Sequence, residues 1–215
     1  MSKLYTNIFD RSRNKIWKRL SKFSSIGYLG GGTALALQIN HRISYDFDIF
    51  TCKSIEKSLL TKVIIVFPNS IIKPLIDNQD ELTIEVDGVK LTFLYYPFKN
   101  ILDQVVTESL SLLDIKDIAA DKAYTIGRRG AWRDYYDIYS ILGKKILNLA
   151  GIIKLANQKF GPLFNEKLFL EQLTYCKDIM DFSIETVEKD AITPEKVQER
   201  LKDLVKDYIS KTLKN

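Results

Sequence analysis

Apolar residues recur at helical spacing near the start of the chain and change to a strand-like alternation further on. Over residues 8–24 the apolar positions fall near one face, which predicts an amphipathic helix. A short apolar run at 26–29 enters a glycine triplet, and residues 34–39 have the composition of a buried helix. Residues 45–50 alternate strictly between two faces, which is the period of a strand. The pattern therefore predicts a domain that mixes helices with strands.

This mixed pattern continues to about residue 98, and the chain beyond it has a helical pattern. Residues 55–67 predict a helix that passes into a short strand. Strands at 82–86 and 90–95 flank Asp87-Gly88, a dipeptide typical of hairpin turns. Five later segments have an apolar period close to that of a helix: 114–128, 131–143, 145–159, 165–187 and 194–213. We therefore predict an α+β protein with a mixed domain at 1–98 and an all-helical domain at 99–215.

Composition narrows the class of protein without naming a function. The chain has 215 residues, enough for one large domain or two small ones, and 46% of them are hydrophobic, which is ordinary for a soluble globular protein. No apolar run is long enough to cross a membrane, and the N-terminus lacks the apolar stretch of a signal peptide. Cys52 and Cys176 lie far apart with no metal-ligand spacing around them. We therefore expect a cytoplasmic protein that does not enter membranes.

The formal net charge of +5 is unevenly distributed along the chain. Asp10 is the single acid among the first 25 residues, which carry seven basic ones: Lys3, Arg11, Arg13, Lys15, Lys18, Arg19 and Lys22. The simpler interpretation is a helix with a solvated basic face, because nucleic-acid binding needs more than charge. The alternative is a surface that holds RNA phosphates without reading sequence, through Arg11, Arg13, Lys15 and Lys18.

The chemistry of the chain is concentrated between the glycine triplet and the alternating strand. Side chains two residues apart on a strand share a face, so Asp46 and Asp48 should project together. Two neighbouring carboxylates suit a hard cation such as Mg²⁺, which usually arrives with substrate phosphates. Backbone amides at Gly31 and Gly32, at the start of a helix, favour phosphate oxygens, and Thr33 can add a hydroxyl or cap the helix. Together these groups predict a phosphoryl-transfer site.

Each part of this pattern also has a purely structural interpretation. The glycines alone predict a tight strand-to-helix turn, and the two aspartates alone predict an exposed strand face. A Walker A loop is excluded because no Gly-Lys-Ser/Thr follows, and the Rossmann fingerprint is absent. The functional interpretation is favoured because both features occur with twelve residues between Thr33 and Asp46, and because Ser44 completes a Ser-x-Asp-x-Asp run.

These motifs resemble the signature of the polymerase-beta-type nucleotidyltransferase superfamily, a Gly-Gly/Ser turn followed by Asp-x-Asp. They resemble more closely the AbiEii/AbiGii toxin family, in which Gly-Gly-Thr precedes a Ser-x-Asp-x-Asp strand. That family has a later helical motif with a lysine and then an Arg-Asp-x-x-Asp run. The segments 117–122, ending in Lys122, and 133–137, which contains Asp134, are similar to it. The resemblance covers roughly residues 25–143.

The resemblance implies an enzyme that uses Mg²⁺ or Mn²⁺ and moves a nucleoside monophosphate from an NTP to an acceptor. The acceptor would be RNA, such as the 3′ end of a tRNA, and the protein would be the toxin of a toxin–antitoxin or phage-defence pair with a cognate antitoxin. Lys122 would contact the triphosphate, with Asp134 supporting the site. From spacing alone, a catalytic role for Lys122 and Asp134 is balanced by a structural alternative, a surface network of arginines and aspartates that joins two helices.

One departure from the superfamily keeps other functions open. A third carboxylate usually lies on a neighbouring strand, and the expected strand at 91–96 contains no acid. Glu85, across the predicted hairpin, is the nearest candidate. The missing acid suggests a module that binds NTP without turnover. Transfer to a small molecule or a protein hydroxyl is a separate hypothesis for an active enzyme.

Overall fold

The computed structural model describes residues 3–126, 128–187 and 192–213, and these form two compact units. The first unit comprises Met1–Lys99 and Asp103–Asp114, and the second comprises Asn100–Leu102 and Ile115–Asn215. The segment 103–114, which the sequence pattern assigned to the helical domain, pairs with the first unit. The Leu29 amide donates to the Ser111 carbonyl at 2.8 Å, and the Leu113 amide donates back to Leu29 at 2.8 Å. It contains no helix.

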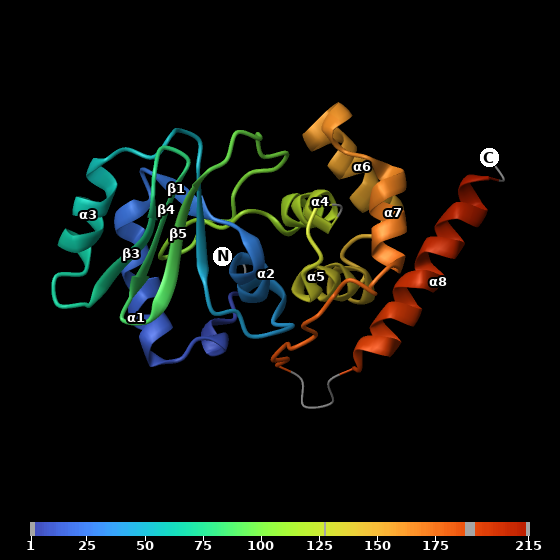
Figure 1. The fold of residues 1–215 in the computed structure, drawn as a ribbon, viewed down its shortest axis with the longest axis horizontal. Coiled ribbons are helices and arrows are strands. Elements are labelled where there is room, and N and C mark those ends of the chain that lie inside the picture. Colours follow the sequence, from blue (N-terminus) through green and yellow to red (C-terminus); the bar gives the residue numbers. More distant parts are fainter. Residues whose placement is uncertain (1–2, 127, 188–191, 214–215) are drawn as a thin grey trace. The chain divides into compact units, whose positions relative to one another are not determined.

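The first unit is built on a five-stranded mixed sheet of order β1-β2-β5-β4-β3 (Figure 1). Its strands are β1 (Gly27–Leu29), β2 (Phe47–Thr51), β3 (Ile72–Asp77), β4 (Glu81–Val86) and β5 (Val89–Tyr95). Only β2 and β5 run parallel; the other neighbours are antiparallel. The predicted hairpin at Asp87-Gly88 is confirmed, since both residues have the positive φ of its turn and Val86 pairs with Val89.

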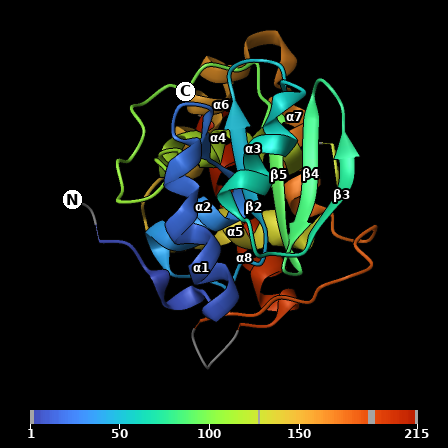
Figure 2. The ribbon, with the colours of Figure 1, turned by 90° about the vertical axis from the view of Figure 1, so that its left-hand side faces the viewer.

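Two helices cover the apolar face of this sheet, α1 (Arg11–Arg19) and α3 (Ser58–Val66), as Figure 2 shows. The single helix predicted over residues 8–24 is instead α1 between two short 3-10 turns, η1 (Thr6–Ile8) and η2 (Leu20–Phe23). The Phe23 ring meets Phe93 of β5 edge-on at 5.1 Å, which places the core between α1, α3 and the sheet. The strand predicted at the end of the 55–67 run does not form, because α3 continues to Val66.

The helix α2 (Gly31–Ile39) connects β1 to the loop before β2 and is almost wholly buried. Its apolar residues from Ala34 to Leu37 are fully buried, as the composition predicted. The Tyr5 amide donates to the Leu37 carbonyl at 2.8 Å, and the Gln38 side chain donates to the Leu113 carbonyl at 2.9 Å. Surrounding segments therefore hold α2 on several sides, which fixes the glycine turn at its start.

The second unit is helical, with α4 (Ile115–Ile126), α5 (Trp132–Gly143), α6 (Leu149–Phe160), η3 (Gly161–Leu163), α7 (Glu166–Thr174) and α8 (Pro194–Thr212). Helix α4 packs on α5 and α6, and α7 packs on α8. The helix predicted over residues 165–187 is wrong in its second half, because α7 ends at Thr174 and residues 175–187 form no helix. No helix within the described parts of the chain combines the length and apolarity needed to cross a membrane.

Candidate active site

The glycine turn and the aspartate strand meet directly in the first unit. The Gly30 amide donates to the Asp48 carbonyl at 2.8 Å, which ties the end of β1 to β2. Gly31 has φ +63°, and a Cβ atom built on it would lie 2.7 Å from Oδ2 of Asp48. Glycine is therefore favoured at residue 31 both by its backbone conformation and by the close approach of the Asp48 carboxylate. The structure brings together two motifs that are separate in the sequence.

A buried arginine that the sequence analysis did not select lies over the next glycine. A Cβ atom on Gly32 would lie 2.2 Å from Nη2 of Arg42, so the guanidinium occupies the space that the glycine leaves open. Arg42 is 2% exposed and donates through Nη1 to the Ile43 carbonyl at 3.0 Å. It therefore adds a positive charge beside the turn. The only signal for it in the sequence is its position between the two motifs.

Thr33 and Ser44 join the start of α2 to the loop that precedes β2. Their hydroxyls are hydrogen-bonded to each other at 2.8 Å, and the Thr33 hydroxyl also donates to the main-chain carbonyl of Asp46. Both residues are buried, and the N-cap position of α2 is occupied by Gly30 rather than by Thr33. In this conformation the two hydroxyls hold the Asp46 loop in place, and the suggested capping by Thr33 is not observed.

Asp46 and Asp48 lie at the beginning of β2, next to the turn. The strand begins at Phe47, so Asp46 is the residue just before it, and both aspartates are partly exposed. Phe47 and Ile49 are fully buried on the opposite face, which confirms the predicted alternation for the strand itself. Two partly exposed carboxylates beside a glycine turn match the donor set that suits Mg²⁺ bound together with substrate phosphates.

Threonines occupy the positions beside Asp48 on the neighbouring strands. Thr92 of β5 is in register with Asp48. Thr83 of β4 is in register with Thr92, and their hydroxyl oxygens lie 3.2 Å apart. Glu85 is two strands away from β2, on the order of 10 Å, and lies 3.8 Å from Lys73. The geometry does not favour Glu85 as a metal ligand. Within the described residues, no group of three or more His, Cys, Asp or Glu could hold a metal ion.

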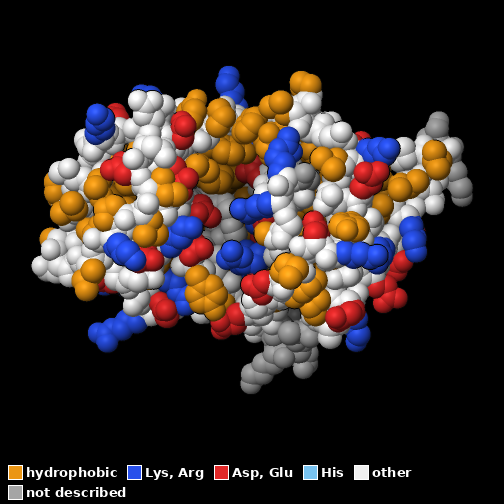
Figure 3. Space-filling model, in the orientation of Figure 1, with side chains coloured by type: hydrophobic (Ala, Val, Ile, Leu, Met, Phe, Trp, Pro, Cys, Tyr) orange, Lys and Arg blue, Asp and Glu red, His pale blue; other side chains and the backbone are white. Residues whose placement is uncertain are grey.

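The four basic residues proposed from the sequence as RNA contacts do not share one environment. Arg13 is 8% exposed, forms an ion pair with Asp10 at 3.0 Å and donates to the Ser44 carbonyl at 3.0 Å. It therefore supports the Ser44 loop, and its burial does not favour the predicted surface contact with RNA. Arg11, Lys15 and Lys18 are exposed, with Lys15 near Asp87 at 3.3 Å. On the face in Figure 3, Lys and Arg side chains stand among Asp and Glu.

In the second unit, Lys122 and Asp134 belong to a buried ionic network. Nζ of Lys122 on α4 lies 2.6 Å from Asp134 and 2.7 Å from Asp137, both on α5. Arg129 approaches the other oxygen of Asp134 at 2.9 Å. Burial alone would raise the pKa of Asp134, but the charges of Lys122 and Arg129 outweigh it, and the pKa lies below its usual value. The network joins α4 and α5 as the structural alternative expected, but its Lys and Asp side chains are buried, while Arg129 is exposed.

The acidic residues that precede Lys122 form a second buried network. Lys159 of α6 contacts Asp117 at 2.9 Å and Asp121 at 2.6 Å. Asp117 also accepts hydrogen bonds from the amides of Ile101 and Leu102, at 3.0 and 2.9 Å. These bonds attach residues 100–102 to the second unit, and they assign Asp117 a structural role.

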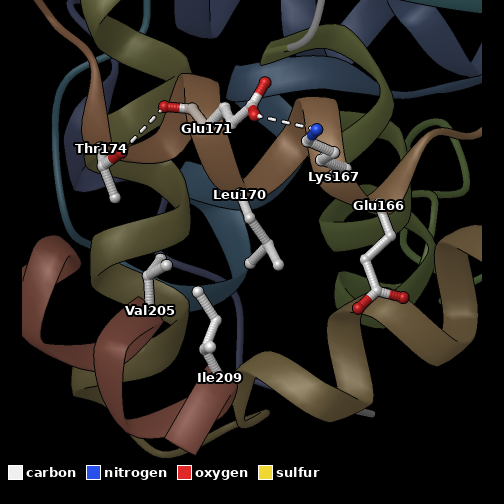
Figure 4. Close-up of a pocket in the computed structure, with 7 residues that line it drawn as sticks. All are labelled: Glu166, Lys167, Leu170, Glu171, Thr174, Val205 and Ile209. Atoms are coloured by element: carbon white, nitrogen blue, oxygen red, sulfur yellow. Dashed lines mark hydrogen bonds and ion pairs between the residues drawn. The ribbon is translucent and has the colours of Figure 1, made fainter. Parts of the chain in front are cut away.

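An open groove lies between α7 and α8 of the second unit (Figure 4). It has a volume of about 510 Å³ and is lined by Glu166, Lys167, Leu170, Glu171, Thr174, Val205 and Ile209. Its floor is apolar, and its single basic side chain, Lys167, lies 3.8 Å from Glu171. This groove contains none of the sequence motifs, so the candidate active site is the turn and the aspartates of the first unit.

Solved structures identify the class to which this fold belongs. A candidate nucleotidyltransferase from H. pylori matches with a TM-score of 0.61 and 18% identity, over 96% of this chain and 98% of that one. JHP933 from Helicobacter pylori matches with a TM-score of 0.55 and 17% identity, over 98% of each chain. The nucleotidyltransferase toxin MenT4 from Mycobacterium tuberculosis H37Rv matches with a TM-score of 0.59 and 12% identity, over 89% of this chain and 80% of that one. The protein therefore has the α+β nucleotidyltransferase fold, as the sequence predicted.

Within this class, a curated sequence defines the family. The chain belongs to the same family as the uncharacterized protein aq_aa25 of Aquifex aeolicus (strain VF5). The two are 30% identical over 199 residues, which is 88% of this chain and 94% of that protein. The chain matches no family model. Its resemblance to the AbiEii/AbiGii toxins accordingly stays a prediction.

Proposed function

We propose that this protein is a nucleotidyltransferase that moves a nucleoside monophosphate from an NTP to RNA and releases pyrophosphate. The observation that carries the proposal is the contact between the glycine turn and Asp48. The turn has positive φ at Gly31 and packs against the Asp48 carboxylate. This supports a site in which the turn would bind an anion and Asp48 would bind a metal ion beside it. Neither a plain turn nor a plain exposed strand face requires this arrangement.

Each group at the turn has a definite chemical role in this proposal. Asp46 and Asp48 would hold Mg²⁺ or Mn²⁺, which neutralises charge on the transferring phosphoryl group when it is bound. The amides of Gly31 and Gly32 would donate to the triphosphate oxygens, and the Arg42 guanidinium would lower the cost of bringing that anion to the turn.

The helical residues enter the proposal through the family resemblance. Lys122 would contact the triphosphate, and Asp134 would keep the Lys122 side chain in one conformation through their contact at 2.6 Å. The toxin role and a cognate antitoxin also come from the resemblance, supported by the fold shared with MenT4, which is described as a nucleotidyltransferase toxin. We infer that the acceptor is the 3′ end of an RNA inside the cell.

The decisive experiment follows label from each α-labelled NTP, with Mg²⁺, onto total RNA and total protein. Asp46→Asn and Asp48→Asn should each lower the transfer at least about a hundredfold, because a group that stabilises transition-state charge has an effect of this size. Asp77→Asn, an exposed residue at the end of β3, is the matched control and should keep full activity.

A non-catalytic NTP-binding module is the second candidate, and one observation favours it. Thr92, rather than an acid, stands beside Asp48 on the neighbouring strand. NTP binding that depends on Mg²⁺, without any pyrophosphate release, would support this candidate. Label on protein or on a small molecule would move the acceptor to that class. No NTP binding at all would overturn both candidates.

A further inference from the structure

A second cavity of about 530 Å³ lies in the first unit, away from the glycine turn. It opens at the start of β1, by Gly27, and at the end of β2, by Thr51, which are paired in register. The glycine turn follows the other end of β1. The candidate active site and this cavity are therefore at opposite ends of the β1–β2 pair. None of the proposed site residues lines the cavity.

Two lysines give the cavity wall a positive charge. Lys53, in the loop after β2, and Lys62, on α3, both line it. Among the residues that the structure describes, neither of them forms an ion pair with a carboxylate. Glu56 is the one acid on the wall, and it accepts a hydrogen bond from the Ser58 hydroxyl at 3.1 Å. Two lysines against one acid leave a net positive charge that suits an anion.

The uncharged part of the wall offers many hydrogen-bond donors. The serines Ser24, Ser25 and Ser54 line the cavity and can donate, whereas Ser58, also in the wall, donates to Glu56. Ser58 is also the first residue of the nine-residue helix α3, whose N-cap residue makes no side-chain cap. The Leu59 amide of the first turn already donates to the Glu56 carbonyl at 2.9 Å. The serine hydroxyls can donate to phosphate oxygens, and the dipole of α3 adds to the charge of the lysines. The volume is in the range of sites that hold a molecule of nucleotide size.

The cavity adjoins the basic N-terminal elements. Nζ of Lys62 lies 5.7 Å from the centre of the Phe23 ring in η2, and Arg19 donates to the Val66 carbonyl of α3 at 2.6 Å. Lys22 precedes the cavity residue Ser24 by two positions, and both Lys18 and Lys22 are exposed. The basic side chains of α1 and η2 therefore lead toward the cavity within the same unit.

We propose that this cavity, with Lys53 and Lys62, binds a phosphate-bearing nucleotide of an RNA strand that also follows the exposed lysines of α1 and η2. The identity of that RNA as an acceptor rests on the proposed function, but its binding does not. Contacts of this kind position a strand and carry no sequence information. RNA binding at this cavity should therefore be independent of base sequence and strongly dependent on salt.

The test measures the affinity for a labelled single-stranded RNA of mixed sequence, without NTP or divalent metal. Lys53→Gln/Lys62→Gln should bind roughly 25-fold more weakly at about 0.1 M salt, because each lost phosphate contact removes about 0.7 from the slope of log K against log salt. The control Lys73→Gln/Lys90→Gln removes the same charge from two exposed lysines that do not line the cavity. Equal affinities of the two double variants would overturn the proposal.

A second measurement uses the protein without substitutions, so its result does not depend on whether a variant folds. Cys52 is exposed and lines the cavity, so bound RNA should slow its alkylation by iodoacetamide several-fold, and high salt should restore the rate. Free adenosine monophosphate and inorganic phosphate serve as separate competitors. If adenosine monophosphate or phosphate protects Cys52 and RNA does not, the cavity binds a free phosphate compound and the proposed RNA ligand is wrong. If nothing protects Cys52, the site is wrong, whatever the label-transfer experiment shows.

Discussion

Gly31 is the residue at which backbone conformation and site geometry depend on each other. Its φ of +63° belongs to the left-handed region, and the Asp48 carboxylate occupies the place where a side chain would begin. An L-residue there would meet a conformational penalty and a contact at the same time. Gly88 provides a comparison, because it has φ +81° with nothing within 4 Å of a built Cβ atom.

We therefore predict that Gly31→Ala destabilises the protein more than Gly88→Ala. The left-handed conformation should cost each variant about 1–2 kcal/mol of unfolding free energy, and the displaced Asp48 adds a further loss in Gly31→Ala alone. Urea unfolding gives the stability, and Mg²⁺-dependent NTP binding should fall in Gly31→Ala and stay intact in Gly88→Ala. Equal NTP binding by both variants would show that the close approach at Gly31 has no role in the site.

The buried network around Asp134 predicts a dependence of stability on pH. The pKa of Asp134 is lower in the folded protein than in the unfolded chain, where an aspartate titrates near about 3.9. Between the folded and the unfolded pKa of Asp134, the unfolded state binds more protons than the folded state. The stabilisation of the fold by the charged carboxylate is therefore complete above about pH 4 and is lost as the pH falls through the folded pKa.

Asp134→Asn removes this titration and provides the test. As the pH is lowered below about 4, the unfolding free energy of the original protein should decrease more steeply than that of Asp134→Asn. Urea unfolding at a series of pH values measures both. Parallel curves for the two proteins would mean that the network does not hold the carboxylate in its charged form.

The beginning of α1 links a helix cap to the loop of the candidate site. The Asp10 carboxylate accepts from the Arg13 amide at 2.8 Å and pairs with the Arg13 guanidinium, which in turn donates to Ser44. Arg13 also lies over the Tyr45 ring, 4.5 Å from its centre. One short element therefore supports the loop that carries Asp46.

Asp10→Ala should lower the unfolding free energy by about 1 kcal/mol, the usual effect of losing an N-cap. Asp10→Asn keeps a side-chain acceptor for the Arg13 amide and should lose less, because asparagine is as good a cap as aspartate. Thermal or urea unfolding of the two variants makes the comparison. The same loss in both would assign the effect to the ion pair with Arg13 instead of the cap.

Secondary structure elements differ in how far local sequence determined them. The β4–β5 hairpin was predicted because alternation and a turn dipeptide coincide there. Strand β3 was not predicted, since it is an edge strand with five of its six residues exposed, and it contains Pro74. An exposed edge imposes no alternation of apolar and polar residues, so its pairing with β4 leaves no periodic signal.

At the level of the whole chain, each of the two units contains one cysteine. Cys52 is exposed in the first unit, and Cys176 is buried in the second. Burial raises the pKa of the Cys176 thiol to about 11, with a small opposing effect from Lys202 and a further rise from Asp178. Because the thiolate is the reactive form, Cys176 is protected both by its pKa and by its burial.

Iodoacetamide at pH 8 should therefore alkylate Cys52 in the native protein and leave Cys176 unmodified. Cys176 should react only as urea unfolds the second unit, so its labelling reports the stability of that unit separately. Mass spectrometry of the digested chain at each urea concentration distinguishes the two sites. Labelling of Cys176 at the native rate of Cys52 would contradict the buried environment described here.

The sequence by itself determined the fold class, the hairpin and the aspartate strand. Each of these depends on neighbouring residues, through periodicity or a turn dipeptide, so local pattern is sufficient. It also indicated Gly31, Asp46 and Asp48 as one site, since their residue types share one chemistry.

Only the tertiary structure decided the surroundings of these residues. It placed the Arg42 guanidinium over Gly32, buried Arg13 against the Ser44 loop and enclosed Lys122 between two aspartates. It also joined the segment 103–114 to the first unit. Local sequence predicts that a charged residue is exposed, because its hydrophilic side chain is the only information that the pattern contains about its burial. Whether it is buried depends on partners far away in the sequence, which the fold alone brings into contact.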